Sequence, residues 1–336
     1  MTATSSRDSR HDRAQAVVAF GGGHGLHASL SALRRLVDDL TVDELTAVVT
    51  VADNGGSSGR LRREFDVLPP GDLRMALAAL CGSDDWGQTW ADVLQHRFAG
   101  DGEMKGHSLG NLLIVGLWER LGDHVQALDW VGRLLGAKGR VLPMALVPMD
   151  ISAQVRGLLL DDPHALTSVR GQVQVATTDG VIDSVALVPA DPPAAPEAVA
   201  AIGAADWVFL GPGSWFTSVI PHLLVPGLRE ALTTTHGHVV VVLNLAEQAG
   251  ETPGFGPADH LAVLLEHAPD LTVHTVLADR GSVADGLAEL REIVAACGAA
   301  LVLDDVSVGD GTARHDPDKL AAAYARIMAR DGGPDD

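Results

Sequence analysis

The chain has 336 residues, 46% of them hydrophobic, and a formal net charge of −20. Because nucleic-acid binding depends on clustered Lys and Arg that neutralise phosphates, this charge argues against a nucleic-acid surface and favours small molecules or proteins as partners. Cys81 and Cys297 lie far apart and outside any metal-ligand spacing. We therefore expect neither a disulfide framework nor a structural zinc site.

The two ends of the chain are polar and rich in Gly, Pro or Ser, so residues 1–14 and 331–336 are predicted to be disordered tails around a single domain at 15–330. The first residues lack the apolar core of a signal peptide, and the apolar run at 207–225 is interrupted by glycines and prolines. These features predict a cytoplasmic protein without a membrane span.

The first half of the chain reads as the start of a parallel sheet. The apolar run AVVAF at 16–20 ends in GGGHG, and Leu26, Leu30, Leu33 and Val37 follow at helical spacing. A second apolar run at 46–52 ends at Asp53. Strand, glycine loop, helix and strand in this order favour an α/β, Rossmann-like, doubly wound fold with a mainly parallel sheet.

Helices are expected near 71–80 and 107–121, where Asp72 and Ser108 are candidate N-caps. Between about 141 and 190, short alternating runs such as QVQVATT and SVALVPA predict hairpins, and hence a small β-rich inserted subdomain. After a Pro/Ala linker at 191–198, buried strands are expected to begin near 207, 239, 271 and 299.

A glycine loop lies where the first strand meets the first helix. Glycines let backbone amides approach a phosphate at the positive end of a helix. The alternative is a tight turn without a ligand, since such a pattern is weak alone. The candidate binding residues of this loop are Gly21, Gly22, Gly23 and Gly25.

The segment after the second strand, DNGGSSG, is the most informative. Ligands of open α/β sheets bind beyond the carboxyl ends of the strands, and here a carboxylate, an amide and two hydroxyls are available. Asp53 could hold a ribose hydroxyl or a metal-bound water. The alternative is an Asx-turn followed by a capping serine. The candidates are Asp53, Asn54, Gly55, Gly56, Ser57, Ser58 and Gly59.

Two further loops carry candidates for the same edge of the sheet. GPGSWFTS at 211–218 repeats the pattern of strand, glycine turn and helix start, although a plain constrained turn would also explain it. The candidates there are Gly211, Pro212, Gly213, Ser214 and Thr217, with Asn111 from GHSLGN at 106–111. Position alone suggests Asn244, Glu251, Thr252 and His260.

Catalytic motifs are missing from the sequence. It contains no Walker A motif and no HExxH. Ser214 lacks the context of a nucleophile elbow, and a single histidine such as His107 more often packs or caps than acts as a base. We therefore assign no catalytic residue and no metal ligand.

Taken together, GGGHG, VADNGGSSGRLR, PPGDLR, GHSLGN, GPGSWFTSVIPHLLVPG and AGET resemble the YvcK family of the CofD-like superfamily. The resemblance implies binding of a UDP-sugar, notably UDP-N-acetylglucosamine, and a role in gluconeogenic growth, cell-envelope synthesis and cell shape. It also implies that Arg314 is a basic contact to the ligand. The family usually has Asp and Thr where this chain has Asn54 and His24, and many members have Tyr near Leu290.

Three hypotheses follow. The leading one is a UDP-sugar-binding regulator that needs no cofactor and acts through an unidentified protein partner, with self-association left open. The alternative is a Mg²⁺-dependent transferase of the CofD type that moves a phospholactate unit onto a deazaflavin precursor, which Asn54 disfavours because hard cations prefer carboxylates. An NAD(P)-dependent enzyme would rest on the glycine loop alone.

Overall fold

The computed structural model describes residues 15–248 and 250–330. The predicted tails at 1–14 and 331–336 lie outside these residues. A seven-stranded sheet with the order β10-β9-β8-β7-β1-β2-β3 runs through the molecule, and every neighbouring pair in it is parallel. Its strands are β1 (Ala16–Gly21), β2 (Glu44–Val49), β3 (Arg140–Pro143), β7 (Trp207–Leu210), β8 (His238–Val242), β9 (Thr275–Asp279) and β10 (Ala300–Asp304).

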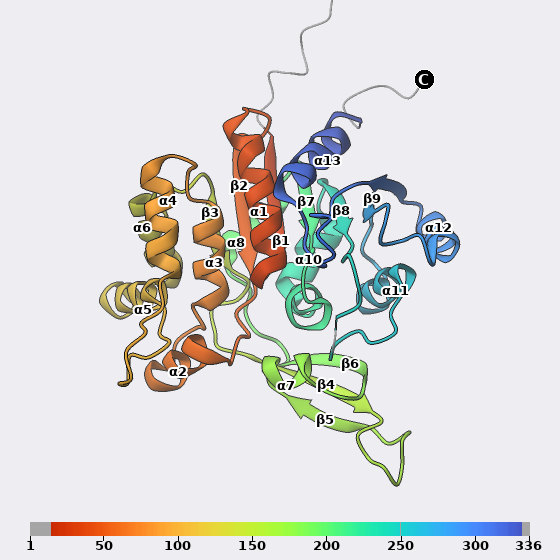
Figure 1. The fold of residues 1–336 in the computed structure, drawn as a ribbon, viewed down its shortest axis with the longest axis horizontal. Helices are drawn as coiled ribbons and strands as arrows, with labels where there is room; N and C mark the ends of the chain where they lie inside the picture. Colours follow the sequence, from red (N-terminus) through yellow and green to blue (C-terminus); the bar gives the residue numbers. More distant parts are fainter. Residues whose placement is uncertain (1–14, 249, 331–336) are drawn as a thin grey trace, which may run out of the picture.

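Helices cover both faces of this sheet, so the Rossmann-like, doubly wound α/β prediction is confirmed (Figure 1). The central strands are apolar and buried because they have helices on both sides. The helices are α1 (Gly23–Asp38), α2 (Gly56–Phe65), α3 (Gly71–Ala79), α4 (Asp85–Gln95), α5 (Leu109–Leu121), α6 (His124–Leu135), α8 (Pro196–Ala204), α9 (Ile220–Leu223), α10 (Pro226–Thr234), α11 (Pro257–His267), α12 (Leu287–Ala296) and α13 (Pro317–Arg330).

The order of the strands reverses between β1 and β7. From β1 the chain adds β2 and β3 on one side, and from β7 it adds β8, β9 and β10 on the other. Loops that leave neighbouring strands in opposite directions open a crevice at their carboxyl ends, and ligands of such sheets bind there. The glycine loop after β1 and the GPGS loop after β7 flank this point.

A small antiparallel sheet with the order β5-β4-β6 projects beyond that end of the main sheet (Figure 1). It consists of β4 (Asp150–Arg156), β5 (Thr167–Arg170) and β6 (Val181–Val188), with α7 (Gln172–Ala176) between β5 and β6. The predicted β-rich subdomain is therefore present. The run at 140–143, which we had expected to open it, is instead the edge strand of the main sheet.

One segment of this subdomain was predicted wrongly. QVQVATT alternates like a strand, yet residues 172–176 form α7. The backbone N–H of Val173 donates to the side-chain oxygen of Asn54 at 3.1 Å. This bond satisfies one of the free donors in the first turn of a helix. A contact between residues distant in the sequence thus stabilises a helix that the local pattern does not predict.

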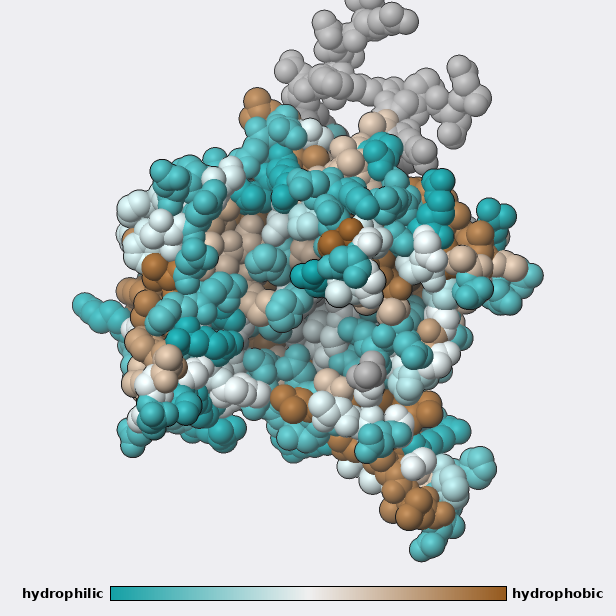
Figure 2. All heavy atoms as spheres, in the orientation of Figure 1, coloured by the Kyte–Doolittle hydropathy of each residue, from teal (hydrophilic) through white to brown (hydrophobic). Residues whose placement is uncertain are grey.

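The outer surface is largely hydrophilic, in keeping with the net charge (Figure 2). Exposed leucines gather on the β4–β5 loop, where Leu160 is 97% exposed and Leu159 and Leu166 are about half exposed. Within residues 15–248 and 250–330, we find no helix that combines the length and the apolar character needed to cross a membrane.

Candidate functional site

A cavity of about 580 Å³ opens at the carboxyl edge of the main sheet, at the reversal between β1 and β7. Its size is that of ordinary small-ligand sites. Three loops that follow β1, β7 and β8 form its floor, and α7 and a C-terminal loop add walls. The lining residues are Gly22, Gly23, His24, Gly25, Asp72, Gln172, Val173, Ala176, Thr177, Pro212, Gly213, Ser214, Thr217, Ser218, Asn244, Leu245, Ala246, Glu247, Gln248, Ala313 and His315.

The glycine loop and the GPGS loop touch each other. A Cβ added at Gly25 would lie 2.3 Å from the carbonyl oxygen of Pro212 and 2.5 Å from Cα of Gly213. No side chain fits such a gap, so Gly25 is required for this close approach. The contact brings the N-terminus of α1, with its free amides and positive dipole end, beside the second glycine turn. Together they make a surface suited to an anion.

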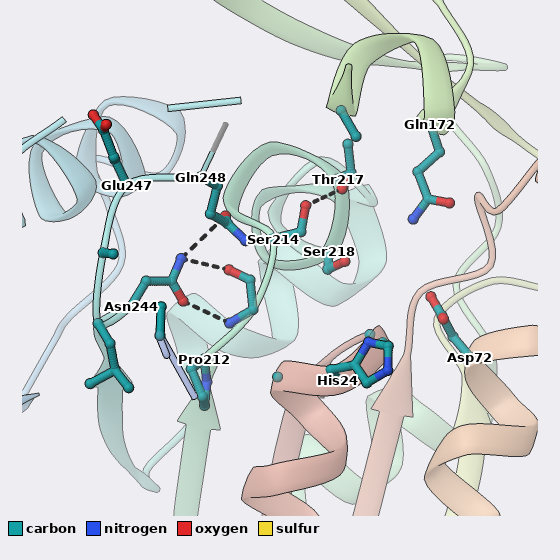
Figure 3. A pocket seen from close by; sticks show the side chains of 18 of the residues that line it. His24, Asp72, Gln172, Pro212, Ser214, Thr217, Ser218, Asn244, Glu247 and Gln248 are labelled. Atoms are coloured by element: carbon teal, nitrogen blue, oxygen red, sulfur yellow. Dashed lines mark hydrogen bonds between the residues drawn. The ribbon is translucent and has the colours of Figure 1, made fainter. Parts of the chain in front are cut away.

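Polar side chains hold the GPGS loop from the other side (Figure 3). Asn244 accepts from the N–H of Gly213 at 3.0 Å and donates to its carbonyl oxygen at 2.8 Å. Gln248 accepts from the N–H of Trp215 at 3.1 Å and from Asn244 at 3.3 Å. The backbone of the loop is thus fixed by amide groups that follow β8.

Glu251 fixes the next turn, the π-helical segment at Trp215–Val219. Its carboxylate accepts from the hydroxyls of Ser214 and Thr217 and, at 3.1 Å, from the N–H of Phe216. Ser214 and Thr217 also bond to each other. Because Glu251 is 3% exposed, these bonds form away from water, where their loss is costly. The AGET motif therefore shapes the loop, and its glutamate is not a cavity-lining group.

Asp72 is one of two acidic residues in the cavity lining, the other being Glu247. Its position was predicted as an N-cap, but α3 begins after Pro70 and the carboxylate makes no capping bond. Instead it lies against the start of α1, where the N–H of Gly23 donates to it. Burial, reinforced by the charge of Asp53, raises the pKa of Asp72 to about 7. One of its oxygens is buried without a hydrogen-bond partner.

The loop at 53–59 lies behind the cavity, and none of the lining residues comes from it. Asp53 accepts from the N–H of Gly55 at 2.8 Å, the Asx-turn that was the alternative interpretation, and its other oxygen faces Gly71. Gly59 packs on the carbonyl of Asn54, which a Cβ there would approach to 2.0 Å. The loop bonds to α7 through Asn54, and the charge of Asp53 acts on Asp72.

Asn54 connects this loop to the subdomain. Its amide donates to the side chain of Gln174 at 2.8 Å while its oxygen accepts from Val173. Gly55 and Gly56 lead into α2, where Ser58 lies inside the first turn and is not the N-cap. Through this connection, α7 presents Gln172, Ala176 and Thr177 to the cavity.

A buried polar network stands where GHSLGN meets α2. Ser57 accepts from Asn111 at 3.1 Å and from the N–H of Ser108 at 3.3 Å, and it lies 3.1 Å from Nδ1 of His107. Arg74 donates to Asn111 at 2.9 Å. Ser108 begins α5, but its hydroxyl donates to the carbonyl of Leu94 and does not cap the helix. Every member of this network is bonded to protein, so it stabilises the site from outside.

The remaining sequence candidates lie at different distances from the cavity. Gly21 ends β1 and Gly211 directly follows β7, and neither is among the lining residues. His260 packs edge-on against Trp215 under the GPGS loop. Arg314 pairs with Asp310 at 2.7 Å and its side chain is 68% exposed, although Ala313 and His315 on either side line the cavity.

The structure places Leu290 and His24, two residues that differ from the family pattern, at different distances from the cavity. Leu290 is fully buried in α12 and does not reach the cavity. His24 lies on the rim of the cavity, in the first turn of α1. Of the two, His24 alone is placed to affect a ligand.

A divalent cation has few candidate ligands here. Within the described parts of the chain, no group of three or more His, Cys, Asp or Glu side chains is arranged to hold a metal ion. Asp53 and Asp72 do form a neighbouring carboxylate pair. Mg²⁺ is commonly held by one or two carboxylates together with substrate phosphates and water, and of these two carboxylates only Asp72 lines the cavity.

The fold, the glycine loops and the carboxylate pair together define a CofD-type α/β protein. Residues 17–308 match the family described as 2-phospho-L-lactate transferase CofD, and the chain belongs to this family.

Its similar proteins are named as gluconeogenesis factors and not as transferases. It is 54% identical over 319 residues to a Mycobacterium tuberculosis protein named "Putative gluconeogenesis factor", with 94% of this chain and 91% of that protein covered. It is 33% identical to the gluconeogenesis factor of Listeria innocua, with 93% and 95% covered. A crystal structure of a UPF0052-family protein from Bacillus halodurans has a TM-score of 0.80 and 33% identity, and covers 93% of this chain and 99% of that one.

Proposed function

We propose that this protein binds a UDP-sugar, UDP-N-acetylglucosamine in particular, and acts in the cytoplasm as a regulator of gluconeogenic growth, cell-envelope synthesis and cell shape. The observation that carries the proposal is the contact between the glycine loop and the GPGS loop at the reversal of the sheet. Residues of two separate turns there line one cavity of about 580 Å³. The names of the relatives support the link to gluconeogenesis.

The ligand would lie along the edge of the sheet. The diphosphate would accept hydrogen bonds from amides in the first turn of α1, which have no partner within the helix, and from the N–H of Ser214 in the GPGS loop. The N–H groups of Gly213 and Trp215 are already bonded to Asn244 and Gln248. Gln172 on α7 and Thr177, which directly follows this helix, offer polar groups to a sugar. The subdomain that carries them would then sense whether the sugar is bound, and a regulatory protein partner could respond to it.

Isothermal titration of the purified protein with UDP-N-acetylglucosamine tests this proposal. ADP-glucose, which joins a different base and a different sugar through the same diphosphate, is the control for non-specific diphosphate binding. We expect saturable heat with the UDP-sugar and at least tenfold weaker binding of ADP-glucose. A folded protein that gives no heat at millimolar UDP-N-acetylglucosamine would refute the proposal.

A CofD-type transferase is the second candidate, and the carboxylate pair of Asp53 and Asp72 favours it. Both carboxylates would hold Mg²⁺, which would neutralise charge on the phosphates of a nucleotide-linked donor. The test is incubation with donor, deazaflavin acceptor and Mg²⁺, followed by mass spectrometry. A transfer product that is formed by the wild-type protein and not by Asp72→Asn would establish this activity. Binding of the nucleotide without any product would favour the regulatory function over the transferase.

A further inference from the structure

Large apolar side chains lie exposed on α4 and α6, which pack together at the end of the molecule where β3 forms the edge of the main sheet (Figure 1). Trp86 and Trp130 are more than half exposed, and Leu134 is nearly half exposed. We call these three residues, together with the partly buried Trp90, the α4–α6 face. Exposed aromatic side chains that lie together are typical of protein interfaces and uncommon elsewhere on a surface.

The four residues of the α4–α6 face form one continuous surface. The indole N–H of Trp86 donates to the backbone carbonyl of Leu134 at 3.3 Å. The ring centroids of Trp86 and Trp90 lie 5.7 Å apart, and Trp130 and Leu134 are one helical turn apart on α6. The first turn of α4 therefore lies beside the last turn of α6.

Opposite charges flank the face at this point. Asp85 is the first residue of α4, and Arg133 lies in the last turn of α6 with its guanidinium 5.1 Å from the ring centroid of Trp130. Both side chains are exposed, and within residues 15–248 and 250–330 neither of them forms an ion pair. The face thus has an unpaired acid at the start of α4 and an unpaired base at the end of α6.

We infer that the α4–α6 face binds a second copy of this chain, with a two-fold axis that runs between the two helices and along them. Rotation about this axis places the first turn of α4 in each copy over the last turn of α6 in the other. Asp85 of each copy then lies opposite Arg133 of the other, so both charges gain a partner twice. An acidic or a basic partner alone would leave one of the two charges unpaired.

The size of the face sets the strength of the association. From their exposed fractions, the four side chains offer roughly 400 Å², about half of what each partner buries in a stable interface. The polar residues around them must supply the rest. We therefore expect a dimer that forms at micromolar concentrations, whether or not a nucleotide is bound.

Sedimentation velocity of the full-length protein between about 1 and 100 µM tests the inference. The mean mass is expected to rise from that of one chain toward that of two. Trp130→Glu places a charge within the face and should weaken association about tenfold or more. Leu160→Glu is the matched control, because Leu160 is exposed on the β4–β5 loop, outside the face, and it should associate as wild type. Circular dichroism checks that each variant is folded.

A pair of charge reversals tests the geometry and leaves the apolar side chains intact. Arg133→Glu and Asp85→Lys each place like charges opposite one another in both symmetric contacts, so each variant alone should associate about tenfold more weakly than wild type. In an equimolar mixture, one copy of each variant restores opposite charges at both contacts. The mixture should therefore associate about fivefold or more strongly than either variant alone.

Three results would overturn the inference. Wild-type protein could keep the mass of one chain at every concentration, which would leave the face to a different partner. Trp130→Glu could associate as strongly as wild type. The mixture of charge-reversed variants could associate no better than either variant alone. Because none of these measurements involves a nucleotide, a failure to bind UDP-N-acetylglucosamine would count against the proposed function only.

Discussion

Substitution of Gly25 by Ala tests whether two loops hold the ligand together. The added Cβ would lie 2.3 Å from the carbonyl oxygen of Pro212, so the loops must separate by about 1 Å to regain ordinary contact. Such overpacking costs about 1–3 kcal/mol, and the helix gains up to about 1 kcal/mol from the replacement of Gly by Ala. We expect a net loss of stability of about 1 kcal/mol.

The effect on binding should be larger than the effect on stability. Loss of one hydrogen bond to a charged phosphate costs about 1.5–3 kcal/mol, which is about a tenfold to hundredfold loss of affinity. Titration with UDP-N-acetylglucosamine and thermal denaturation measure the two effects. Gly116→Ala is the matched control, because Gly116 lies within α5 with open space around it. Unchanged affinity in a folded Gly25→Ala protein would refute a cradle shared by both loops.

Three further predictions concern the groups around the cavity. Folding raises the pKa of Asp72 from 3.8 to about 7, so the stability that this group contributes is fully present below pH 3.8 and is lost as the pH rises through 7. Asp72→Asn should therefore stabilise the protein at pH 8 and have little effect at pH 4. Denaturant unfolding at the two pH values measures this. Glu251→Gln should lower the free energy of unfolding by about 1.5–3 kcal/mol, because an amide cannot accept all the bonds that the carboxylate accepts, and an unchanged denaturation midpoint would contradict this. Arg314→Ala should leave the free energy of unfolding within about 0.5 kcal/mol of the wild-type value, because the pair of Arg314 with Asp310 is exposed. The same variant should bind UDP-N-acetylglucosamine more weakly by about 1.5–3 kcal/mol. An unchanged affinity in titration would remove Arg314 from the site.

The parallel sheet could be predicted from the sequence because its strands are short apolar runs that end in glycine or polar loops. In such a fold the carboxyl ends of all strands lie on one edge, so GGGHG and GPGS had to lie on the same edge once both were placed after strands. That they are neighbours follows from the strand order, in which β1 pairs with β7.

Contacts between distant residues account for most of what the sequence did not predict. The helix at 172–176 depends on Asn54, which lies more than a hundred residues away. Asp72 was interpreted as a cap because it begins a helical run, but tertiary packing directs its carboxylate to α1.

The loop at 53–59 shows the limit of motif reasoning in another way. Its residues suggested direct ligand contact, yet none of them lines the cavity, and Asn54 bonds to α7. Serine, glycine and asparagine are as useful for a tightly packed turn as for a phosphate site. The spacing of the residues therefore could not distinguish a supporting loop from a binding loop.

A crystal structure of the protein with UDP-N-acetylglucosamine tests the central claim most directly. We predict the diphosphate between the first turn of α1 and the GPGS loop, within hydrogen-bond distance of backbone amides from both. A ligand bound elsewhere, or one whose phosphates touch only one of the two turns, would contradict it.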